Sequence, residues 1–179
     1  PNERLLEIEG VRDLPLDAAF RVADELLMRS ISGVSEMLSK EGVVNLDFQD
    51  LRSVMENGGG VAVIGLGEAH GEGRAEKATE EALESPLLDI DISDARGALV
   101  NVVGGPTLSL GDAELCAKLI REKVNPYARI IWGATTDDTM GDNIRVLLVL
   151  TGVKSEQIDG ASRHTQIRNL RDRTVEFVN

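Results

Sequence analysis

The sequence is poor in aromatic residues, cysteine and histidine. Phe, Trp and Tyr make up 3% of the 179 residues, so a core must be built from aliphatic side chains. The single cysteine, Cys116, excludes an internal disulfide and a cysteine-based zinc site. Cys116 lies in an amphipathic stretch, so we expect a buried, unreactive thiol. The two histidines, His70 and His164, are too few to build a zinc site.

Long apolar runs and an excess of positive charge are absent as well. No run approaches the roughly 20 residues that a membrane-spanning helix needs, and no basic, apolar leader suggests secretion. The formal net charge of −12 opposes binding to nucleic acid or to anionic lipid. We therefore expect a cytoplasmic protein without a nucleic-acid partner. The chain begins at Pro1 rather than Met, which we interpret as a cut or engineered fragment.

The first third of the chain has helical periodicity. Apolar residues at spacings of three and four predict one long helix over residues 14–39, about 39 Å in length. The residues of its apolar face are Leu16, Phe20, Ala23, Leu27, Ile31, Val34 and Leu38. A shorter helix is predicted over residues 48–57, ending at a run of glycines.

Apolar runs rich in β-branched residues alternate with amphipathic stretches in the remainder. Strands are predicted at residues 61–67, 97–105, 128–135 and 143–153, and helices at residues 75–85 and 110–124. This order predicts an α/β domain whose helices cover at least one face of a mixed four-stranded sheet. The short loop between the last two strands predicts that they are antiparallel neighbours.

A glycine-rich segment follows the first predicted strand. Gly65, Gly67 and Gly71 occupy the place of a dinucleotide-binding turn. Their spacing departs from that motif, and Glu68 and Glu72 would face the pyrophosphate, so a tight strand-to-helix turn that leaves His70 in a solvated loop is favoured.

An acidic segment separates the last two predicted strands. Asp137, Asp138 and Asp142 form a cluster that would suit a hard cation, but the spacing lacks the closing Glu of a calcium loop. We favour an exposed acidic loop and predict no metal ligands.

The segment "NLDFQD" follows the long helix and has two compatible interpretations. Asp47 can cap the helix that begins at Phe48, with Asp50 returning a hydrogen bond as in a capping box. In this interpretation Leu46, Phe48 and Leu51 are core residues. Capping does not account for Asn45, and it leaves room for Asp47 or Asp50 to act on another chain.

Four stretches together resemble FtsZ, the tubulin-like GTPase that builds the prokaryotic division filament. They are "NLDFQDLRSVM", "GLGEAHGEGRAEKATEEAL", "SPLLDIDISDARGALVNVVGGPTLSL" and "IIWGATTDDTMGDNIRVLLVLTGV", and "PLDAAFRVADELLM" is similar to the central helix of archaeal members. The resemblance implies a central helix (within residues 14–57) followed by the C-terminal α/β domain of the tubulin–FtsZ fold (residues 58–153). Residues 1–13 would be a linker remnant, and residues 154–179 a polar tail.

The resemblance also implies roles for particular residues. The segment with Asn45, Asp47 and Asp50 resembles the synergy loop, which enters the nucleotide pocket of the next subunit and polarises the water that attacks the γ-phosphate. Phe20 and Asp24 correspond to the positions that stack on guanine and hydrogen-bond its edge. GTP or GDP is the implied nucleotide and Mg²⁺ the implied cation, although the glycine-rich signature loop of the nucleotide-binding half does not occur in this sequence.

Several partners follow from the same resemblance. They are further copies in a head-to-tail filament at the division site, the nucleotide-binding half of the same protein, and membrane-tethering division proteins. The last class stays open, because "RNLRDRTVEFVN" does not match the family's recruiting peptide. This half alone is expected to be inactive, its site being completed in trans. The alternative is a stand-alone α/β module with a small-molecule site at the turn of residues 65–73.

Overall fold

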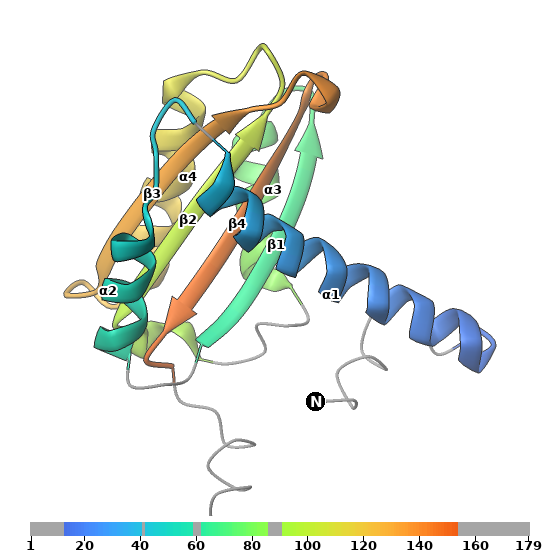
Figure 1. The fold of residues 1–179 in the computed structure, drawn as a ribbon, viewed down its shortest axis with the longest axis horizontal. Helices are drawn as coiled ribbons and strands as arrows, with labels where there is room; N and C mark the ends of the chain where they lie inside the picture. Colours follow the sequence, from blue (N-terminus) through green and yellow to red (C-terminus); the bar gives the residue numbers. More distant parts are fainter. Residues whose placement is uncertain (1–12, 41, 59–61, 86–90, 154–179) are drawn as a thin grey trace, which may run out of the picture.

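The computed structural model describes residues 13–40, 42–58, 62–85 and 91–153, and the predictions for residues 1–12 and 154–179 lie outside them. Two helices come first in the chain, and two further helices alternate with the four strands of one sheet (Figure 1). The elements in chain order are α1 (Leu16–Ser39), α2 (Phe48–Gly58), β1 (Ala62–His70), α3 (Arg74–Glu84), η4 (Ile92–Asp94), β2 (Gly97–Gly104), α4 (Leu110–Lys123), β3 (Arg129–Thr136), η5 (Asp138–Met140) and β4 (Asn143–Thr151).

The mixed four-stranded sheet that the sequence predicts is confirmed, but one strand pairing is not. The strand order is β1-β4-β2-β3, with β4 antiparallel to β1 and β2, and β2 parallel to β3. The prediction that β3 and β4 are neighbours is wrong, because β2 lies between them. Strand β4 is buried along almost its whole length. This burial suits a central strand, because helices cover both of its faces and a neighbouring strand pairs with each of its edges. The six residues that link it to β3 easily span the roughly 10 Å across one intervening strand.

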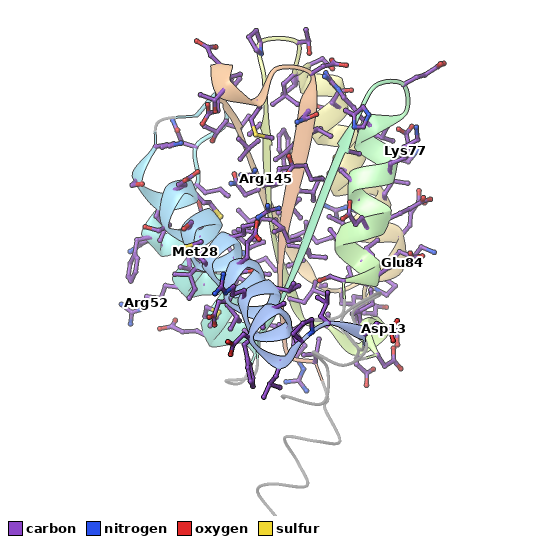
Figure 2. All side chains as sticks on the ribbon, turned by 90° about the vertical axis from the view of Figure 1, so that its right-hand side faces the viewer. Asp13, Met28, Arg52, Lys77, Glu84 and Arg145 are labelled. Carbon is purple, nitrogen blue, oxygen red and sulfur yellow. The ribbon has the colours of Figure 1, made fainter. Side chains whose placement is uncertain are left out.

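Helices cover both faces of the sheet. Figure 2 shows the sheet between α1 and α2 on one side and α3 and α4 on the other. The α3–α4 side encloses the larger cluster of buried residues, in which alanines of both helices pack around Cys116 and Ile120. The thiol of Cys116 is buried as predicted, and burial raises its pKa to about 11. The α1–α2 side holds a smaller cluster centred on Val54 and Leu99.

The long helix forms almost as predicted, although most of its apolar face does not join the core. Ala23 is buried, whereas Leu16, Phe20, Leu27 and Ile31 are between 50% and 71% exposed. Figure 1 shows why: α1 crosses the sheet with its C-terminal part and then continues past the edge strand β1. Its N-terminal part therefore has no sheet beneath it, and periodicity could not reveal this.

The glycine-rich segment differs from the predicted turn. Gly65 and Gly67 lie within β1, which continues to His70, and the turn itself is made by Gly71 and Gly73 with positive φ angles. A side chain at Gly67 would collide with the backbone of α3 at Ala78. Gly67 therefore allows close helix–sheet packing.

Candidate functional site: the loop between the long helix and α2

Residues 42–47, here called the connecting loop, carry the predicted site residues into α2. The backbone N–H of Asp50 donates to Oδ1 of Asp47 at 2.8 Å, and the N–H of Asp47 donates to Oδ2 of Asp50 at 3.3 Å. These two bonds form the reciprocal capping box, which confirms the capping interpretation. Each carboxylate commits one oxygen to the box, and its second oxygen accepts no hydrogen bond within the described residues.

Asn45 stabilises the opposite end of the connecting loop. Its side-chain oxygen Oδ1 accepts a hydrogen bond from the backbone N–H of Gly42 at 2.6 Å, which closes a tight turn. Asn45 and Asp47 are exposed, and Asp50 is partly so. The three side chains predicted to act together thus come from one short, internally hydrogen-bonded segment that faces solvent.

The apolar residues around this segment divide between core and surface. Leu46 is buried and Leu51 half-buried, as predicted, but Phe48 is 68% exposed, so its placement in the core is wrong. Val43 is 66% exposed as well. Phe48 is the first residue of α2, where a side chain can leave the packed face of the helix. The polar site is therefore flanked by two exposed apolar side chains.

Strand β3 fixes the connecting loop to the sheet. Val44 and Ala134 exchange two backbone hydrogen bonds, Val44 N–H to Ala134 O at 3.1 Å and Ala134 N–H to Val44 O at 3.0 Å. Leu46 packs where a Cβ on Gly133 would stand 2.6 Å from its Cγ, so this approach requires glycine. Sequence reasoning missed Gly133, although a glycine inside the apolar strand "IIWGAT" is a known signal of close backbone approach.

An ion pair ties the end of α1 to the segment after β3. Nζ of Lys40, the C-cap residue of α1, lies 3.1 Å from Oδ2 of Asp137 and 3.3 Å from Oε2 of Glu36. The side-chain and backbone hydrogen bonds from Thr139, followed by Lys40, lower the pKa of Asp137 to about 2. The same carboxylates raise the pKa of Lys40.

The acidic segment does not gather its carboxylates into one cluster. Asp137 faces Lys40, whereas Asp142 pairs with Arg74 at 2.8 Å. The largely buried guanidinium of Arg74 also bonds Asp112, at 3.1 Å, and so joins α3, α4 and the start of β4. Asp142 remains 65% exposed in its side chain, as an exposed acidic loop predicts, but Asp137 is only 25% exposed. Within the described ranges, no group of three or more potential ligands is arranged to hold a metal ion.

The other predicted site residues lie far from the connecting loop. Phe20 and Asp24 are one turn apart on the N-terminal part of α1 that extends past β1, here called the projecting part, with Phe20 half-exposed and Asp24 exposed. The fifteen residues from Asp24 to the end of α1 correspond to about 22 Å of helix. The structure therefore separates the predicted residues into two groups, one on the N-terminal half of α1 and one beyond its C-terminal end, and it does not form one site from them within a single chain.

Comparison with known proteins identifies close relatives of this chain. A family model described as "FtsZ family, C-terminal domain" matches residues 60–154. "Cell division protein FtsZ 1" of Archaeoglobus fulgidus is 52% identical over 160 residues, which cover 89% of this chain and 43% of that protein. "Cell division protein FtsZ" of Haloferax mediterranei is 49% identical over 166 residues, covering 93% of this chain and 43% of the relative. The chain thus spans less than half the length of these relatives.

Solved structures give the same result. "FtsZ dimer, empty (M. jannaschii)" superposes with a TM-score of 0.78 at 47% sequence identity, covering 85% of this chain and 43% of that one. CetZ2 from Haloferax volcanii, solved as a GTPγS-bound protofilament, superposes with a TM-score of 0.63 at 20% identity and supports the fold alone. No helix in the described ranges is long and apolar enough to cross a bilayer.

Proposed function

Because this chain belongs to the FtsZ family, with the family's C-terminal domain over residues 60–154, we propose that it is the activating half of a filament-forming cell-division GTPase. It would supply the connecting loop to the nucleotide pocket of the next subunit. The main support is that Asn45, Asp47 and Asp50 lie on one hydrogen-bonded segment that faces solvent. Among the described residues of this chain, no group stands opposite them on which they could act. Such a segment suits a site that two subunits complete together.

The chemistry assigned to the connecting loop is the positioning of water. The carboxylate oxygens of Asp47 and Asp50 that remain outside the capping box can accept hydrogen bonds from a water and orient it toward a γ-phosphate. The capping box and the Val44–Ala134 bridge limit the movement of the backbone that carries the two carboxylates. Their position relative to a bound water would therefore be well defined. The exposed Phe48 offers an apolar contact to a neighbouring subunit beside these polar groups.

The nucleotide itself would be held elsewhere. Phe20 and Asp24 would contact the guanine of this subunit's own nucleotide, because an aromatic ring can stack on the base and a carboxylate accepts both donors of its edge. Neither they nor the loop residues belong to a group of three or more potential metal ligands in the described structure. Mg²⁺ bound with GTP in the neighbouring pocket would offset the repulsion between the loop carboxylates and the phosphates. This half alone would therefore hydrolyse no GTP.

Assembly follows from the same proposal. Copies would join head to tail in a cytoplasmic filament at the division site, each connecting loop meeting the nucleotide-binding half of the next subunit. The M. jannaschii relative named as a dimer supports self-association of the family. The exposed apolar residues on the projecting part of α1 would pack against the nucleotide-binding half of the same protein. Membrane-tethering division proteins stay a candidate class of partner, and nucleic acid is not expected.

The test separates capping from catalysis by substitution at one position. The chain is mixed with a GTP-loaded, amino-terminal nucleotide-binding half of the family, and phosphate release is followed. Asp47→Asn keeps a good capping side chain but removes the charge, whereas Asp47→Ala removes both. We expect both variants to lose turnover by about two orders of magnitude or more, as water-positioning groups do in other GTPases. Urea unfolding should show a loss of about 1 kcal/mol for the alanine variant alone.

The matched control is Gln49→Ala, on an exposed residue of the same first turn of α2. It should leave turnover unchanged. Full turnover with Asp47→Asn would contradict the proposed role of the carboxylate, and no stimulation by the unaltered chain would contradict the proposed function as a whole.

A further inference from the structure

The connecting loop is attached to the sheet from its two sides by different means. On the α2 side, the hydroxyl of Thr151 on β4 donates to the backbone oxygen of Val54 at 2.9 Å, and the buried Leu46 packs on Gly133. On the α1 side, Met37 is buried against Leu99 and Val149 of the sheet. The Lys40–Asp137 ion pair adds a polar contact between the end of the helix and the segment after β3. The α1 side thus combines apolar packing of the helix on the sheet with a polar contact at its C-terminal end.

Asp137 is the fixed partner in this contact. Its backbone N–H donates to the oxygen of Gly104 on β2 at 2.8 Å, and its Oδ1 accepts from Thr139 N–H at 3.0 Å and from Thr139 Oγ1 at 2.6 Å. Its other oxygen, Oδ2, is the one that meets Lys40. Lys40, by contrast, lies at the end of a helix, where its N–H still bonds the oxygen of Glu36 at 2.9 Å. The carboxylate therefore presents a rigid anchor to the C-cap residue of α1.

We propose that Lys40 and Asp137 are positioning residues for the trans-acting site, a proposal that rests on the proposed function. The pair holds the end of α1 against the sheet and so sets where Asn45 and Asp47 lie relative to the neighbouring nucleotide. Two observations distinguish it from a surface ion pair without consequence. It joins residues 97 positions apart in the sequence, and it acts at the same edge as the Val44–Ala134 bridge, two residues before the start of the turn that Asn45 closes.

The first measurement needs no activity. Hydrogen exchange of the Val44 and Ala134 amides is compared between the unaltered chain and the variants Lys40→Met and Asp137→Asn. In Asp137→Asn, the side-chain oxygen can still accept the hydrogen bond from the Thr139 N–H. Because exposed ion pairs contribute modestly, we expect exchange up to about fivefold faster at these amides, with α4 unchanged. The control is Arg52→Met, which breaks a surface pair with Glu56 within α2, 2.7 Å long. Unchanged exchange in both test variants would overturn the proposal.

The second measurement asks whether the held geometry matters for chemistry. In the phosphate-release assay, both variants should lower the maximal rate, by up to about fivefold, because the loop side chains are less well aimed at the neighbouring nucleotide, without altering the chain concentration that gives half of that rate. Lys40→Arg, which restores the cation, should recover the rate, and Arg52→Met should not alter it. Faster exchange with a full maximal rate would overturn the positioning role. If the unaltered chain does not stimulate release, the proposed function fails, while the exchange data still decide whether the pair holds the loop.

Discussion

The two faces of the sheet are covered by helices in different ways. On the α3–α4 face, small residues such as Ala78, Ala82 and Ala113 are fully buried, and the helices lie close against the strands. On the other face, α2 lies over β2 and the C-terminal part of α1 crosses the sheet, whereas the rest of α1 extends beyond it. The first face is closed within this chain, and the second leaves apolar and polar side chains exposed.

The difference suggests that the α3–α4 face mainly stabilises the fold, whereas the α1–α2 face is available to contact other domains or subunits. A closed face loses free energy of folding when its packing is altered, because buried atoms have no alternative contacts. An exposed helix face contributes little to folding of the chain that carries it, yet it offers surface to another domain or subunit. Both groups of predicted site residues, on the projecting part of α1 and in the connecting loop, belong to the second face.

The strongest way to break the closed face is to add volume at Gly67. Gly67→Val would force β1 and α3 apart, because the new side chain would meet the backbone of Ala78. We expect a loss of about 3 kcal/mol in the free energy of unfolding, measured in urea. Gly111→Ala in α4 is the control: a Cβ there has ordinary contact with Ser109 at 3.6 Å, so the change should be neutral or slightly stabilising. Equal stability of both variants would contradict the close-packing interpretation.

A matched pair of isoleucine truncations compares the two faces directly. Ile120 is fully buried on α4, and Ile31 is 67% exposed on α1. Ile120→Ala should cost about 3 kcal/mol, because it leaves a cavity, whereas Ile31→Ala should stay within about 0.5 kcal/mol. Thermal or urea unfolding of the two variants measures the difference. Similar losses at both positions would mean that the exposed face of α1 is covered within this chain.

The smallest expected effect concerns the titration of Asp137. Its pKa of about 2 lies below the ordinary value of 3.8, so the carboxylate stabilises the fold fully above about pH 4 and loses this contribution as the pH falls toward 2. NMR titration of the carboxyl carbon gives the midpoint directly. Thr139→Val should raise the midpoint more than Lys40→Met, because the Thr139 hydroxyl is the larger cause of the shift. A midpoint near 3.8 in the unaltered chain would contradict the hydrogen-bonded geometry.

Much of the candidate site could be predicted from local sequence. The capping box depends on Asp47 and Asp50 three residues apart, a local arrangement that any helix start can form, and the structure contains it. The contacts that hold the loop could not be predicted in this way. Val44 and Ala134 are 90 residues apart in the chain and Lys40 and Asp137 are 97 apart, and no periodicity relates their positions.

The sequence by itself determined which segments form helices and strands, the buried state of Cys116 and the family, because these follow from local periodicity, composition and motifs. Only the tertiary structure decided that β4 is central, that Phe48 faces solvent, and that β3 holds the connecting loop. The physical reason is that pairing and burial depend on which surfaces meet in space. An apolar side chain such as Phe48 has the same local pattern whether the surface above it is a sheet, another subunit or solvent.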